Sequence, residues 1–228
     1  MKASSAPYFS PELFRFLSQL ASHNDRTWFQ ANKPRYEASV LQPSVRFVEA
    51  MGPRLAAISP HLVADARPFG GSVSRIYRDT RFSADKSPYR TNAGILFGHE
   101  MAPTTEEHLP GFYLHLEPGA SFVASGSWRP SRAGLQAIRE AIVSGLRGWD
   151  RVRAQSPPSG GESYARVPRG FSPDSKYADD LRRKDFYSSV PFRDAEITSP
   201  TFGRSFIQTC TRLEPLNRFL ARAFQVPW

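Results

Sequence analysis

Cysteine and long apolar runs are scarce in this sequence, and each scarcity excludes something. The single cysteine, Cys210, cannot form an internal disulfide and cannot build a cysteine-based zinc site. No stretch of about 18 apolar residues occurs, which argues against a membrane span. The N-terminal residues reach a mixed segment at 13–17 without the apolar region of a secretory signal. We therefore expect a cytoplasmic protein that does not associate with membranes.

Familiar motifs of catalysis and cofactor binding are also missing. The chain has no Gly-x-x-x-x-Gly-Lys-Ser/Thr loop, no Gly-x-Gly-x-x-Gly turn and no Gly-x-Ser-x-Gly elbow. Its five histidines form no His-x-x-x-His pair. His115 and Glu117 would share one face of a strand, where such a pair could bind metal or shuttle a proton. An ordinary polar sheet face is the more frequent case, so we expect no metal and no cofactor.

The composition is that of a globular protein with a positive charge excess. The 228 residues, 40% apolar and 22% charged, are enough for one sizeable core. The net charge of +9 points to anionic partners, but it divides into +3 for residues 1–114 and +6 for residues 115–228. Arginine outnumbers lysine 25 to 5, a bias that a GC-rich genome also produces. The positions of the arginines therefore matter more than their number.

The first quarter of the chain has the spacing of helices. Ser10-Pro11-Glu12 is typical of a helix start, and Asn24 is placed to cap a second helix that Pro34 should kink or restart. A third helix should open near Pro43. Later helices are expected from Ser131, with apolar positions Leu135, Ile138, Ile142 and Leu146, over residues 174–183, and from Ser199-Pro200 to the C-terminal region.

The middle of the chain changes to short β-rich runs. Residues 73–78, 93–97, 112–117, 121–124 and 186–190 are predicted strands. Pro118-Gly119 should join two of them in an antiparallel hairpin. We expect an α+β fold, in which N-terminal, central and C-terminal helices pack around a small, mostly antiparallel sheet. Residues 1–9 should be a flexible N-terminus, residues 10–228 one domain, and residues 155–162 an exposed loop.

The most distinctive passage is residues 75–90, with five basic and two acidic side chains in sixteen positions. Arginine side chains there could fork onto phosphate or carboxylate oxygens, and aromatic rings offer stacking faces. The candidate ligand-binding residues are Arg75, Tyr77, Arg78, Arg81, Lys86, Tyr89 and Arg90. Asp79 and Asp85 are the candidate bases or metal ligands of a catalytic version, and Arg169 is a candidate supporting partner.

This passage resembles a family of bacterial and fungal proteins catalogued as domain of unknown function 2461. Further pieces match in the same order, among them residues 24–29, 112–116, 126–130, 168–171 and 184–186. The resemblance covers roughly residues 10–225. Position 90 is Arg where the family often has Lys, so the charge is kept. The resemblance implies a single-domain fold and carries over no activity.

Three functional hypotheses remain open from the sequence. The leading one is binding of an anionic, phosphate-containing small molecule at residues 75–90, with phosphoryl transfer or hydrolysis as its catalytic version. The second is a nucleic-acid-binding module, which the spread charge and the lack of a nucleic-acid motif make weaker. The third is a structural or interaction protein, in which Asp79 and Asp85 pair with neighbouring cations in a network that fixes the fold.

Overall fold

The computed structural model describes residues 6–105, 107–145 and 148–228. The N-terminal half contains α1 (Pro11–Ser22), α2 (Arg26–Tyr36), the π-helical turn η1 (Glu37–Leu41), α3 (Gln42–Ala56), β1 (Ala93–Phe97) and the 3-10 turn η2 (Ala102–Thr104). The remainder contains β2 (Gly111–Leu116), β3 (Ser121–Ser127), α4 (Arg132–Val143), α5 (Trp149–Gln155), α6 (Ala178–Arg182), β4 (Phe186–Phe192), α7 (Asp194–Ile197) and α8 (Phe202–Ala223).

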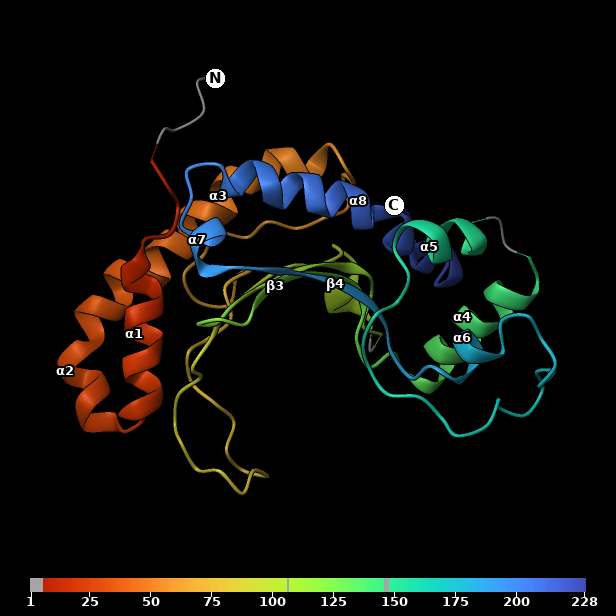
Figure 1. Cartoon of the computed structure of the whole chain (residues 1–228), viewed down its shortest axis with the longest axis horizontal. Helices are drawn as coiled ribbons and strands as arrows, with labels where there is room; N and C mark the ends of the chain where they lie inside the picture. Colours follow the sequence, from red (N-terminus) through yellow and green to blue (C-terminus); the bar gives the residue numbers. More distant parts are fainter. Residues whose placement is uncertain (1–5, 106, 146–147) are drawn as a thin grey trace.

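The four strands form one antiparallel sheet in the order β1-β2-β3-β4. Side chains alternate between its faces, so Ile95, Leu114 and Val123, which are neighbours in register, all point into the core. Figure 1 shows α3 and α8 lying across that face, with α1 and α2 at one end of the sheet and α4 to α6 at the other. The predicted α+β fold with a small antiparallel sheet is confirmed.

Two adjoining apolar clusters stabilise this arrangement. The larger one joins α1, α3, the inner sheet face and the first half of α8 around Phe47 and Phe206. The smaller one joins α4, α5 and α6 to the second half of α8 around Trp149 and Phe219. Because α8 contributes to both, it holds the two ends of the molecule together.

Several predicted helix features differ in the structure. Asp25, not Asn24, caps α2, because its carboxylate accepts a 2.9 Å hydrogen bond from the backbone N–H of Trp28. Pro34 lies inside α2 without ending it, and the irregularity falls at η1, through which the chain continues into α3. The predicted helix over residues 174–183 shrinks to α6.

The ends of the predicted elements also need correction. Phe9, which the sequence analysis placed in a flexible N-terminus over residues 1–9, is fully buried in the larger cluster; residues 1–5 lie outside the described residues. In the apolar face of α4, Ile138 and Ile142 are buried as predicted, and Leu146 lies outside the described residues. Gln155 is the last residue of α5, so the loop predicted over residues 155–162 begins at residue 156, and Ser156 is buried.

The predicted strand over residues 73–78 does not form. Val73 makes an isolated bridge with Ile95 of β1, and the backbone N–H of Ser74 donates to the carbonyl of Gly94 at 2.9 Å. Beyond Ser74 the chain leaves the sheet, because the next residues pair with a later part of the same segment instead. This departure creates the loop that carries the arginine-rich passage.

Candidate functional site

Residues 75–90, here called the arginine loop, close on themselves at their base. The backbone N–H of Arg78 donates to the carbonyl of Pro88 at 2.9 Å, and that of Arg90 donates to the carbonyl of Ile76 at 2.8 Å. In Figure 1 the loop projects from the body beside α1 and α2. The paired base fixes where the loop starts and ends on the molecule.

Tyr89 anchors this base in the protein interior. Its ring is buried and stacks on Phe29 of α2, with 4.1 Å between ring centroids. The side chain of Asn24 holds the Tyr89 backbone from both sides: its Nδ2 donates to the Tyr89 carbonyl at 2.9 Å, and its Oδ1 accepts from the Tyr89 N–H at 3.0 Å. Tyr77 bridges to Tyr89 across the base but leaves half of its surface exposed.

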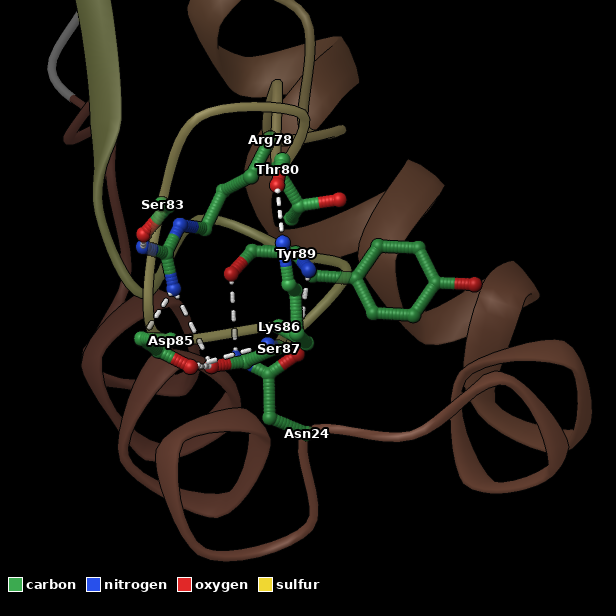
Figure 2. A network of polar contacts seen from close by, with 8 residues as sticks. All are labelled: Asn24, Arg78, Thr80, Ser83, Asp85, Lys86, Ser87 and Tyr89. Carbon is green, nitrogen blue, oxygen red and sulfur yellow. Dashed lines mark hydrogen bonds and ion pairs between the residues drawn. The ribbon is translucent and has the colours of Figure 1, made fainter.

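Arg78 is the centre of a polar network inside the loop (Figure 2). Its guanidinium forms an ion pair with Asp85, and its Nη1 also donates to the hydroxyl of Ser87 at 3.0 Å. Ser87 in turn donates its backbone N–H to Asp85 at 2.8 Å. The guanidinium, the carboxylate and the hydroxyl therefore cross-link the two sides of the loop.

The outer cations of the loop have partners as well. Arg81 forms an ion pair with Asp79, with 2.7 Å between Nη2 and Oδ2, and its Nε donates to Oδ1 at 3.0 Å. The ammonium of Lys86 donates to the backbone carbonyl of Thr80 at 2.9 Å. Three of the five predicted ligand-binding cations thus already have partners within the loop.

Hydrogen bonds hold both loop carboxylates in the ionised form. The hydroxyl and backbone N–H of Ser87, together with Arg78, hold the pKa of Asp85 well below its usual range. The side chain and backbone N–H of Arg81 lower the pKa of Asp79. A carboxylate with a lowered pKa is a weak proton acceptor, so this arrangement suits charge compensation better than general-base chemistry.

Arg75 and Arg90 differ from the other cations of the loop. Both are exposed, and neither side chain has a hydrogen-bond or ion-pair partner among residues 6–105, 107–145 and 148–228. Their charges still act on neighbours: Arg75 contributes to the lowered pKa of Asp79, and Arg90 acts on the hydroxyl of Tyr113. These two guanidinium groups are available to an external anion.

A pocket of about 560 Å³ lies between the arginine loop and the end of α1. It brings together five of the predicted site residues, because Arg78, Asp79, Asp85, Tyr89 and Arg90 all line it. Arg75, Tyr77, Arg81 and Lys86 are not among its lining residues. The remaining lining residues are Ala21, Asn24, Ser87, Thr91 and Asn92.

Sequence reasoning missed the polar side chains at the edges of this pocket. Asn24 was assigned to a helix cap, and its binding to the Tyr89 backbone has no local sequence signal, because 65 residues separate the two. Thr91 and Asn92 directly follow the arginine loop in the sequence, so a candidate segment of residues 75–92 would have included them.

Arg169 lies away from the pocket. It is exposed and belongs to the segment between α5 and α6, at the opposite end of the sheet from the arginine loop (Figure 1). The structure does not bring it to the other candidate residues. Cys210 is buried in α8, where burial raises its pKa well above the ordinary value.

Neither a metal centre nor a membrane segment emerges from the described residues. Within them, no group of three or more histidine, cysteine or carboxylate side chains is placed to hold a metal ion. No helix that the structure describes is both long enough and apolar enough to cross a bilayer.

The fold and the loop define an α+β protein with helices on one face of a four-stranded antiparallel sheet and a cation-rich loop beside its first strand. A family model described as "Conserved hypothetical protein (DUF2461)" matches residues 12–219. The chain therefore belongs to this family, as its arginine-rich passage indicates. No curated protein and no solved structure matches the chain.

Proposed function

We propose that the protein binds an anionic, phosphate-containing small molecule in the pocket beside the arginine loop. The observation that carries the proposal is the state of Arg90, whose exposed guanidinium lines the pocket without a partner among the described residues. A guanidinium presents several N–H donors in a planar fork that matches two phosphate oxygens.

The charge balance of the pocket supports this assignment. Its two carboxylates are each neutralised by an arginine, Asp85 by Arg78 and Asp79 by Arg81. The charge of Arg90 is then left over for a ligand. Thr91 and Asn92, which carry neutral donors, line the same pocket and can complete the coordination of an anion.

In this proposal the members of the loop divide their roles. Arg78, Arg81 and Lys86 stiffen the loop through their internal pairs, so a fold-fixing network and a ligand site coexist. Arg90 contacts the ligand, and Arg75 adds to the positive field from outside the pocket. A catalytic role for Asp79 or Asp85 has less support because both carboxylates are weak bases. A cytoplasmic location is part of the same proposal, since phosphorylated small molecules are abundant there.

The experiment is a thermal-shift panel on the wild type, Arg90→Ala and Arg169→Ala. Arg169→Ala is the matched control, because it removes the same charge from an exposed position outside the pocket. The panel holds phosphate, pyrophosphate, nucleotides and sugar phosphates. A ligand at about 100 times its Kd stabilises the folded state by roughly 2.7 kcal/mol. For a protein of this size, each kcal/mol raises the Tm by roughly 2–4 °C.

The expected result is a selective shift in the wild type and Arg169→Ala that is lost in Arg90→Ala. Equal shifts in all three proteins would show that any binding occurs elsewhere. A flat panel, together with strong destabilisation by Arg78→Ala, would leave the loop with a structural role alone.

One observation favours nucleic acid as a second candidate partner. Phe82, in the projecting part of the loop, is 95% exposed, and the guanidinium of Arg81 lies 5.8 Å from its ring centroid. Exposed aromatic rings with adjacent cations stack on bases of single strands. Oligonucleotides added to the same panel at low and high salt decide this, because counterion release makes such binding fall steeply with salt. A salt-independent or absent oligonucleotide response would reject it.

A further inference from the structure

Three polar side chains form a connected row along the outer face of β2 and the residue that follows it. The hydroxyl of Tyr113 lies 3.1 Å from Nδ1 of His115, and Nε2 of His115 lies 2.9 Å from a carboxylate oxygen of Glu117. The imidazole also stacks on Phe122 of β3, with 4.7 Å between centroids and 12° between planes. Two hydrogen bonds and one stacked ring therefore fix the orientation of His115.

The chemistry of the three groups sets the direction of these hydrogen bonds. A carboxylate only accepts, so Nε2 of His115 must carry the proton that it donates to Glu117. In a neutral imidazole, Nδ1 then has a lone pair and accepts the proton of the Tyr113 hydroxyl. The remaining lone pairs of the Tyr113 oxygen are left to accept a hydrogen bond from outside the row.

The surroundings leave room for the Tyr113 hydroxyl and bring a cation near it. Gly94 of β1 lies beneath this group: a Cβ at that position would be 2.5 Å from the hydroxyl oxygen and 3.1 Å from the hydroxyl of Ser74. The charge of Arg90 acts on Tyr113 and partly opposes the effect of burial, which raises the pKa of Tyr113. Tyr113 is thus a neutral hydroxyl that lies within the electrostatic reach of the Arg90 guanidinium.

The row also adjoins the pocket beside the arginine loop. Ala93 of β1 pairs with Leu116 of β2, so Asn92, one residue earlier, and Glu117, one residue later, flank the same step of the ladder. Asn92 lines the pocket. The outer sheet face is accessible at both ends of the row: 38% of the Glu117 side chain is exposed, and so is 51% of Leu96, which pairs with Tyr113.

We propose that Tyr113, His115 and Glu117 form a proton-accepting site for a hydroxyl group of the ligand whose phosphate Arg90 binds. This inference rests on the proposed function and narrows its ligand class to phosphorylated compounds that carry a hydroxyl. Tyr113 touches the ligand, whereas His115 and Glu117 are positioning residues that act through it.

The proton transfer balances without any further reactant. The O–H bond of the ligand breaks and its proton forms a new bond to the Tyr113 oxygen, while the tyrosine's own proton passes to Nδ1 of His115. The bonding electron pair stays on the ligand oxygen. The resulting imidazolium keeps its proton on Nε2 and still donates it to Glu117 in a hydrogen bond. The negative charge of Glu117 stabilises the imidazolium.

The first experiment reads the tautomer of His115 by ¹⁵N NMR at about pH 8.5, where an ordinary imidazole is neutral. The expected result is a proton on Nε2 and a hydrogen-bonded, unprotonated Nδ1, whose resonance moves in Tyr113→Phe. A proton on Nδ1 in the wild type would overturn the inference, because Tyr113 would then accept from His115 and point its proton outward.

The second experiment compares the affinities of glycerol 3-phosphate and n-propyl phosphate, which lacks the hydroxyls. The hydroxyl should tighten binding about tenfold in the wild type, the effect of one hydrogen bond to a fixed acceptor. In Tyr113→Phe the two compounds should bind equally, and Arg90→Ala should weaken both. Equal binding of both in the wild type would overturn the hydroxyl site and leave the anion pocket standing. Binding of neither would overturn the anion pocket, and this ligand class with it.

Discussion

Asn24 shows how a single side chain positions the candidate site. It stands between α1 and α2, next to the true helix cap Asp25, and its amide bonds both backbone groups of Tyr89 (Figure 2). A carboxamide is suited to this because it carries a donor and an acceptor side by side. Because Arg90 directly follows Tyr89, this contact also fixes the backbone position of Arg90. The pocket therefore depends on a side chain that lies 65 positions before Tyr89 in the sequence.

Truncation of this amide should therefore loosen the arginine loop. Asn24→Ala leaves the N–H and carbonyl of Tyr89 without their partner and is expected to lower the free energy of unfolding by about 1–3 kcal/mol. Urea denaturation measures the loss. Asn92→Ala is the control, since it removes the same group from the same pocket but breaks no hydrogen bond between described residues. Equal stability of the two variants would mean that the Asn24 contact contributes nothing.

At the scale of elements, local patterns predicted what local interactions determine. The proline and acid at the start of α1, the Ser131 cap of α4 and the Pro118-Gly119 turn each act within a few residues, and these elements form. The prediction of a strand over residues 73–78 was wrong because a β-rich composition does not indicate which segment the strand would pair with. The arginine loop was found as a cluster of charge, but which cations are paired depends on contacts through space.

The contact between α8 and the sheet is another feature that no pattern indicates. Asn217 of α8 is fully buried: its Nδ2 donates to the carbonyl of Gly111 in β2 at 3.0 Å, and its Oδ1 accepts from the hydroxyl of Ser125 in β3 at 2.9 Å. One side chain thus ties a helix to two strands. In a buried site these bonds are strong, and an unpaired group is costly.

Asn217→Ala should destabilise the protein by about 2–4 kcal/mol, because it leaves a buried carbonyl unpaired and opens a small cavity. Ser125→Ala should cost less, since the bond between Asn217 and Gly111 survives. The double variant should lose less than the sum of the single changes, by at least about 0.5 kcal/mol. Chemical denaturation of the three variants gives the cycle. Strict additivity would contradict a shared network.

At the scale of the whole molecule, the C-terminal end of α2 lies near the arginine loop at a buried tyrosine, Tyr36. Tyr36 is 8% exposed, and its ring packs against Phe16 and Phe29 with centroids 5.9 Å and 5.5 Å away. Burial raises the pKa of Tyr36 to about 12, with smaller contributions from Tyr77 and Glu37. Ionisation of the Tyr36 hydroxyl is therefore linked to unfolding of the N-terminal helices together with the arginine loop.

The sign of this linkage predicts how stability changes in alkali. In the unfolded chain a tyrosine loses its proton near pH 10, so between about pH 10 and 12 ionisation favours the unfolded state. The stabilising contribution is complete below about pH 10 and is lost as the pH rises through the folded value. Over that window the wild type should lose up to about 3 kcal/mol more than Tyr36→Phe. Urea denaturation of both proteins at successive pH values measures this difference. Parallel profiles for the wild type and Tyr36→Phe would show that Tyr36 ionises as freely in the folded protein as in the unfolded chain.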